Sequence, residues 1–167
     1  VIIGAHKPQA LGIYAWPSAE NADQLRNNPV YINEYEPLLH DAWKEMHTID
    51  VDLTEDVKIS FDTDKTYTMA LLWLGDKAVY DSYILQSEPL REQLGAKRVF
   101  NLPVSQFDSF AATDADKSPD RVVIVEWHHS SHPDAYLNSP MLTENRPMLQ
   151  QAIAKIDWYE LSHWEGY

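Results

Sequence analysis

Residues 121–140 of the chain read RVVIVEWHHSSHPDAYLNSP, a β-branched run that ends in Trp and is followed by a polar stretch and an Asn-x-Pro step. Residues 10–29 lie 111 positions earlier, read ALGIYAWPSAENADQLRNNP and follow the same plan. Seven identities keep this offset without a gap: Ile13, Trp16, Asp23, Asn27, Pro29, Leu38 and Lys44 match Ile124, Trp127, Asp134, Asn138, Pro140, Leu149 and Lys155. The self-similarity predicts that one structural unit is used twice.

The composition is that of a folded protein with a core. Of the 167 residues 44% are hydrophobic, and they include six Trp and nine Tyr. Disordered chains lack the aromatic surface that offsets conformational entropy, so this class is excluded. The length allows one domain or two small ones.

The charge restricts the partners. The chain carries 26 acidic and 13 basic side chains, a net charge of -13, which repels nucleic-acid phosphates and anionic membranes. No apolar run approaches the roughly 20 residues needed to cross a bilayer. We therefore expect a soluble protein without nucleic-acid or membrane partners.

The chain contains no Cys, which excludes disulfides, thiol nucleophiles and thiolate metal sites. The compartment stays open, with a slight preference for the cytoplasm. The first residue is Val instead of Met, which suggests that a leader or an upstream segment has been removed or was never included.

The hydrophobic pattern predicts alternating strands and helices. Strands are expected over 11–16, 47–53, 57–61, 66–74, 99–104, 107–110, 121–128 and 156–164, with 47–53 and 57–61 forming a hairpin. Helices are expected over 29–46, 79–94, 133–138 and 140–154, with a helix start near residue 22 and a surface loop over 111–120. Short loops between helices and alternating strands favour an antiparallel sheet with helices on one face, an α+β fold of the ferredoxin-like type.

From Thr66 onward, about 100 residues resemble the DUF1330 family of the dimeric α/β barrel superfamily. The resemblance is carried by Lys65 to Ala70, Asp81-Ser82-Tyr83, Gly95-Ala96-Lys97, the strand Arg121 to Trp127, the step Ala135-Tyr136-Leu137-Asn138-Ser139-Pro140, and Glu160 to Gly166. It implies two ferredoxin-like units that pair sheet against sheet into a barrel. It is uninformative about chemistry, because most members of this family lack an assigned reaction.

The resemblance and the repeat together predict the domains. Residues 63–167 would form a complete ferredoxin-like unit, and residues 1–62 a partial repeat without its first strand and helix. The protein is then either a homodimer or a tandem pseudo-dimer.

Period-two alternation on the strand 122–128 places Glu126 and His128 on one face. A barrel interior that held both near Arg146 and Tyr83 could transfer protons on a small organic molecule, because burial tunes Glu and His toward neutral pKa values. Alternatively, Glu126 accepts structural hydrogen bonds and His128 is a solvated strand end.

His128, His129 and His132 form an HHxxxH cluster. Imidazole is a common ligand of zinc, copper and iron, and Asp134 or His163 could complete such a site. A polar loop rich in Ser and His is more often solvated, so we expect no metal and no organic cofactor.

Trp73 and Trp127 each end a strand, and Tyr80 follows at the start of a helix. These aromatic side chains are candidates for substrate binding, with core or rim packing as the alternative.

Kinase, Rossmann and serine hydrolase functions are excluded, because the chain has neither a Gly-rich phosphate loop nor a GxSxG elbow. The sequence predicts a protein that binds a small molecule and could be a cofactor-independent enzyme of the isomerase or monooxygenase type, acting on a small aromatic or polyketide-like molecule. A non-catalytic ligand-binding module and a scaffold are the alternatives.

Overall fold

The computed structural model describes residues 2–3, 10–111 and 118–161. The chain forms two compact units. The ferredoxin-like unit comprises Val1–Lys7, Leu53–Val104 and Pro119–Tyr167, and the small unit comprises Pro8–Asp52 and Ser105–Ser118. Residues 53–62 thus join the ferredoxin-like unit, whereas the sequence analysis places them in the partial repeat.

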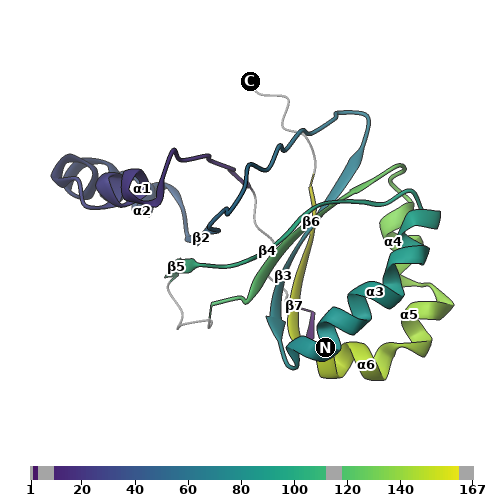
Figure 1. Ribbon diagram of the computed structural model, residues 1–167. Helices are drawn as coiled ribbons and strands as arrows, with labels where there is room; N and C mark the ends of the chain where they lie inside the picture. Colours follow the sequence, from purple (N-terminus) through teal and green to yellow (C-terminus); the bar gives the residue numbers. More distant parts are fainter. Residues whose placement is uncertain (1, 4–9, 112–117, 162–167) are drawn as a thin grey trace. The chain divides into compact units, whose positions relative to one another are not determined.

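The ferredoxin-like unit is a five-stranded sheet covered by helices on one face (Figure 1). Its strands are β1 (Ile2–Ile3), β3 (Thr66–Leu74), β4 (Lys97–Pro103), β6 (Arg121–Trp127) and β7 (Ile153–Leu161), in the order β1-β7-β3-β6-β4. Only β1 pairs in parallel with its neighbour, and all other pairs are antiparallel.

Helices connect each of the two inner strands, β3 and β6, to a strand nearer the edge of the sheet. Helix α3 (Lys77–Gln93) links β3 to β4, and α4 (His132–Leu137), α5 (Pro140–Glu144) and α6 (Arg146–Ala152) link β6 to β7. The order β3-α3-β4-β6-α-β7, with β7-β3-β6-β4 side by side, is the ferredoxin-like arrangement. The predicted α+β class with an antiparallel sheet is confirmed.

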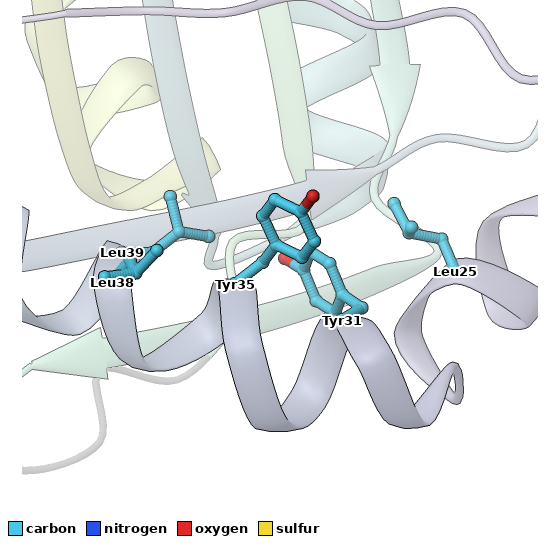
Figure 2. Close-up of a pocket in the computed structure, with 5 residues that line it drawn as sticks. All are labelled: Leu25, Tyr31, Tyr35, Leu38 and Leu39. Carbon is cyan, nitrogen blue, oxygen red and sulfur yellow. The ribbon is translucent and has the colours of Figure 1, made fainter.

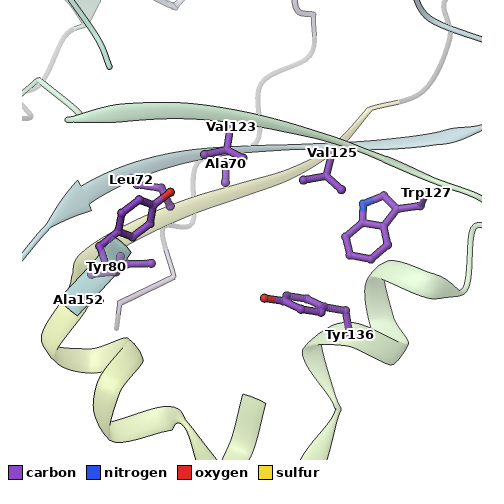
Figure 3. Close-up of a cluster of buried hydrophobic side chains, with 9 residues drawn as sticks. Ala70, Leu72, Tyr80, Val123, Val125, Trp127, Tyr136 and Ala152 are labelled. Atoms are coloured by element: carbon purple, nitrogen blue, oxygen red, sulfur yellow. The ribbon is translucent and has the colours of Figure 1, made fainter. Parts of the chain in front are cut away.

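Alternation along the strands separates the two faces of this sheet. Ala70, Leu72, Val123, Val125 and Trp127 face the helices and form a core with Tyr80, Tyr136, Ala152 and Ile153 (Figure 3). Tyr67, Met69, Leu71, Val122 and Ile124 alternate with them and lie on the other face, where they are also buried. This pattern fixes the register of β3 against β6, because a slip by one residue would exchange the two faces.

The two ends of helix α3 are set by the residues that flank it, Asp76 and Gly95. Asp76 accepts a hydrogen bond from the backbone N–H of Val79 at the N-terminus. Gly95 follows the helix at φ 63°. A Cβ on Gly95 would lie 2.9 Å from the Cβ of His128, so both the backbone conformation and the space require glycine.

The small unit contains three helical segments and two strands. They are α1 (Ala19–Arg26), the π-helical segment η1 (Tyr31–Tyr35), α2 (Glu36–Ala42), β2 (Glu45–Asp50) and β5 (Gln106–Ala111). Strands β2 and β5 pair in antiparallel fashion, and an ion pair between Arg26 and Asp50 links α1 to β2.

Two strand predictions for this part of the chain are wrong. Residues 11–16 form no strand, and no described strand pairs with them, so their backbone has no ladder to join. Residues 57–61 do not pair with β2, whose partner is β5. Strand β5 brings Phe110, which stacks on His40, and Phe107, which contacts His47, whereas Phe61 packs against Tyr67.

Candidate functional site

Tyr67 and Glu126 form a hydrogen-bonded pair on the sheet face that the helices leave uncovered. They are direct partners in the register of β3 and β6. The Tyr67 Oη donates to the Glu126 Oε2 over 3.0 Å and accepts a hydrogen bond from the backbone N–H of Asp62 over 2.7 Å. Burial is the largest cause that raises the pKa of Tyr67, and the hydrogen bond to Glu126 raises it further. The phenol therefore keeps its proton.

Lys65 and His128 lie one cross-strand step beyond this pair. The Lys65 Nζ is 2.8 Å from the His128 Nδ1. Because an ammonium group can only donate, Nδ1 is the acceptor, and a neutral imidazole then carries its proton on Nε2. Tyr67 of β3 and Lys65, directly before β3, thus contact Glu126 of β6 and His128, directly after β6. We call these four residues the polar cluster.

The polar cluster combines groups that can donate, accept and stabilise charge. Glu126 is a carboxylate base, Lys65 is a fixed positive charge, and the Tyr67 phenol and the His128 imidazole are hydrogen-bond donors. Such a set can take a proton from one atom of a small molecule and hold the negative charge that develops on another.

The other two candidate catalytic residues lie on the helical side of the sheet. Tyr83 is buried on α3, and its Oη is 2.8 Å from the Oη of Tyr136. Burial raises the pKa of Tyr83, and the neighbouring Tyr136 raises it further. Arg146 begins α6 and is exposed. The structure places the half-buried Glu126 and the exposed His128 on the same side of the sheet, each with its own partner, but it does not bring Tyr83 or Arg146 to them, because the sheet lies between.

Sequence reasoning missed Lys65 and Tyr67. Tyr67 stands on a strand that was expected and Lys65 directly precedes it, yet their contacts with Glu126 and His128 depend on which strand pairs with β3 and in which register. Period-two alternation gives the face of each strand alone. The sequence therefore lacked the pairing that completes the cluster.

The three candidate metal-binding histidines lie close together. The ring centroids of His128 and His129 are 4.6 Å apart, and those of His129 and His132 are 5.0 Å apart. The Nδ1 of His132 is buried without a hydrogen-bond partner. Among residues 2–3, 10–111 and 118–161, no group of three or more His, Asp or Glu side chains is arranged to hold a metal ion, and His163 lies outside this part of the chain.

The candidate substrate-binding aromatics occupy both faces of the sheet. Trp127 is fully buried, and its Nε1 donates to the Thr68 Oγ1 over 2.8 Å. Tyr80 is buried in the same core, where burial raises its pKa and its Oη accepts a hydrogen bond from Asn101. Trp73 faces the other side, where the Lys155 Nζ lies 4.1 Å from its ring centroid.

The described residues line two open hollows, and neither is lined by a residue of the polar cluster. One, of about 460 Å³, lies between α3 and α6 beside Ala78, Val79, Ser82, Pro147, Met148 and Gln151. The other belongs to the small unit and is described below. Neither contains Glu126, His128 or Arg146, so the expected enclosed pocket around these three side chains is not one of these two hollows.

Within the described ranges, no helix is both long enough and apolar enough to cross a membrane.

Comparison with known proteins finds similar folds without a known activity. No family model matches the chain, and no curated protein matches it. A protein of unknown function from Rhodopseudomonas palustris, RPA0582, is 20% identical, with 63% of this chain and 86% of that chain covered and a TM-score of 0.49. The methylated RPA0582 protein is 18% identical, with 68% and 98% covered and a TM-score of 0.48.

A dimeric protein of unknown function and ferredoxin-like fold from Bacteroides fragilis is 11% identical, with 62% of this chain and all of that chain covered and a TM-score of 0.42. The resemblance to the DUF1330 family remains a prediction, because no family model matches.

Proposed function

We propose that the ferredoxin-like unit binds a small organic molecule at the polar cluster and moves a proton on it without an organic cofactor. The observation that carries the proposal is the cross-strand pairing of Tyr67 with Glu126 beside the contact of Lys65 with His128. A base, a fixed cation and two donors on neighbouring strands can act on one ligand.

The proposed reaction is an isomerisation. The Glu126 carboxylate takes a proton from an acidic C–H beside a carbonyl, and the electron pair moves to the carbonyl oxygen to give an enolate. Lys65 and His128 stabilise that oxygen by charge and hydrogen bonding. In a β,γ-unsaturated carbonyl compound this enolate is conjugated with the C=C bond, so Glu126 returns the proton to the γ carbon. The double bond moves into conjugation with the carbonyl, the atoms balance and no oxidant is needed. An oxygenation would need O₂ as a further reactant.

The remaining candidates enter the proposal with different roles. Trp73 lies on the same face of the sheet as the polar cluster and could contact an aromatic ligand through its ring. Trp127, Tyr80 and Tyr83 belong to the helical side and would support the sheet from behind. Arg146 has no role in this reaction.

Ligand binding without reaction is the second candidate function. It is favoured by the hydrogen bonds of Tyr67, whose hydroxyl already has both a donor and an acceptor inside the protein. A fully satisfied pair fixes a binding surface more readily than it changes partners during a reaction.

The proposal includes a pseudo-dimer within one chain, with a homodimer as the alternative. The repeat at the 111-residue offset supports it. Sedimentation of the full chain tests the homodimer. If the chain sediments as a monomer, the homodimer is excluded and the pseudo-dimer within one chain remains.

Deuterium incorporation tests the proposed reaction directly. The full chain is incubated in D₂O with a panel of small β-dicarbonyl and phenolic ketone compounds, and exchange of the acidic C–H is followed by NMR. Glu126→Gln should reduce the exchange rate at least about hundredfold, the range lost with a general base. Glu144→Gln changes an exposed carboxylate on α5 and should leave the rate unchanged.

Equal exchange rates in the two variants would overturn the proton-transfer proposal. In a second outcome, no compound exchanges its C–H but one compound binds, as measured by thermal shift, and Glu126→Gln weakens that binding. Ligand binding without reaction would then replace the proposed proton transfer.

A further inference from the structure

An apolar groove runs along the helices of the small unit. Leu25 of α1, Tyr31 and Tyr35 of η1, and Leu38 and Leu39 of α2 line it, and they project from one side of the helical segments (Figure 2). Its volume is about 360 Å³. Tyr35 and Leu38 are 58% and 62% exposed, although large apolar side chains are usually buried. We call these five residues the helix groove.

The chain contains a structural counterpart of these helices. Asn27 and Asn138 stand at the 111-residue offset and end α1 and α4 with nearly equal angles, φ -93° and ψ 4° against φ -97° and ψ 8°. The side chain of Asn27 donates to the carbonyl of Asp23 over 2.8 Å, and that of Asn138 donates to the carbonyl of Asp134 over 2.9 Å.

The turn that follows is also the same in both places. The backbone N–H of Tyr31 donates to the side chain of Asn28, and the backbone N–H of Leu142 donates to the side chain of Ser139. Asn28 and Ser139, like Tyr31 and Leu142, are 111 positions apart. The helices of the small unit therefore correspond to α4, α5 and α6, residue by residue around this turn.

The counterpart shows what covers such a face. Leu25, Tyr31 and Leu38 correspond to Tyr136, Leu142 and Leu149, which all pack in or against the core of the ferredoxin-like unit. There strands β3 and β6 supply most of that core, and α3 packs against α5 and α6 beside it. Since helix-lined apolar faces commonly receive another helix, the element that fits the helix groove is a helix with an apolar stripe.

The negative charge of the small unit favours basic residues beside the apolar stripe of that helix. Residues 8–52 and 105–118 carry eleven acidic and three basic side chains. Glu34, Glu36 and Asp41 belong to η1 and α2 themselves. Two copies of this face would bring like charges together, whereas a helix with Lys or Arg beside its apolar stripe is attracted.

We propose that the helix groove binds an amphipathic helix with basic flanks from a partner protein. The apolar stripe of the partner would lie on Leu25, Tyr35 and Leu38, and its basic residues would face the acidic side chains of η1 and α2. The helix groove shares no residue with the polar cluster, so this proposal does not depend on the chemistry of that cluster.

Fluorescence anisotropy tests the proposal with the full chain. The probe is a labelled helical peptide of Leu and Lys with Leu at every third and fourth position, and the control peptide carries Glu in place of Lys. We expect saturable binding of the Lys peptide alone, weaker at high salt because exposed charges are screened.

Two matched leucine variants locate the site. Leu38→Ser should weaken peptide binding about tenfold, the loss typical of a central apolar anchor. Leu85→Ser changes a leucine of α3 that is 76% exposed and should leave binding unchanged. Both residues are exposed, so both variants should fold, which circular dichroism checks.

Three outcomes would overturn the proposal. Absence of binding would do so, as would binding that Leu38→Ser leaves unchanged. The third outcome comes from sedimentation: the full chain would be a dimer and the Leu38→Ser variant a monomer. The groove would then bind a second copy of the chain.

Discussion

The turn after α1 and the turn after α4 have the same hydrogen bonds but different surroundings. Asn27 and Asn138 cap their helices in the same way. Trp16 is 47% exposed while its counterpart Trp127 is completely buried, and Leu25 is 39% exposed while its counterpart Tyr136 is 6% exposed. Local capping thus follows from a few neighbouring residues, whereas burial depends on elements far away in the sequence.

The largest expected difference concerns the two tryptophans. Trp127→Ala removes a fully buried ring and its hydrogen bond to Thr68, and should cost about 3–5 kcal/mol of unfolding free energy. Trp16→Ala should cost less than about 1 kcal/mol, because the ring is already half in solvent. Urea unfolding of both variants measures the difference, and equal losses would mean that Trp16 has a core of its own.

The two leucines at the same offset should differ next. Leu149→Ala removes a side chain that packs against the core of the ferredoxin-like unit and should cost about 2 kcal/mol. Leu38→Ala changes an exposed residue and should stay within about 0.5 kcal/mol. Thermal unfolding compares them, and a large loss for Leu38→Ala would indicate that the helix groove is covered in solution.

Alkaline pH should weaken the ferredoxin-like unit through its buried tyrosines. The pKa values of Tyr67, Tyr80 and Tyr83 are all raised above the usual 10.0, mainly by burial. The folded protein therefore holds these protons more tightly than the unfolded chain. Their stabilising effect is complete below pH 10 and is lost as the pH rises above it.

Tyr83→Phe should flatten this alkaline decline, and it should cost about 1 kcal/mol at neutral pH because the bond to Tyr136 is lost. Urea unfolding at pH values from about 8 to about 11, a range that brackets the ordinary tyrosine pKa, measures both the alkaline decline and the loss at neutral pH. An unchanged slope in the variant would remove Tyr83 as a cause.

The smallest expected effects are those of the two asparagine caps. Asn27→Ala and Asn138→Ala each remove one side-chain hydrogen bond to a helix carbonyl, which should cost about 0.5–1 kcal/mol. Hydrogen exchange of α1 and α4 measures both losses. Similar losses would support a shared local origin of the two turns, and a loss in only one would weaken the comparison.

Much of the ferredoxin-like unit could be predicted from the sequence. The apolar run of β3, the alternating β6 and the Gly95 stop after α3 each carry a local signal. The strand expected over 11–16 has a similar local pattern but does not form, because a strand also needs a partner of matching register. The hairpin expected over 47–61 failed for the same reason, since β2 pairs with β5 instead.

The candidate site was predicted in part. The alternation expected over 122–128 placed Glu126 and His128 on one face, but their partners Tyr67 and Lys65 lie in and directly before β3, whose pairing the sequence does not show. Tyr83 and Arg146 were grouped with Glu126 and His128 because all four carry suitable chemistry. The sheet that separates them could not be foreseen from residue types.

The sequence by itself determined the elements that depend on near neighbours: the helix caps at Asn27 and Asn138, the periodicity of β3 and β6, and the reuse of one turn. Only the tertiary structure decided which strands pair, which tryptophan is buried, and which polar groups meet on the face of the sheet opposite the helices. The physical reason is that capping and alternation act over a few residues, whereas pairing and burial join segments that are distant in the chain.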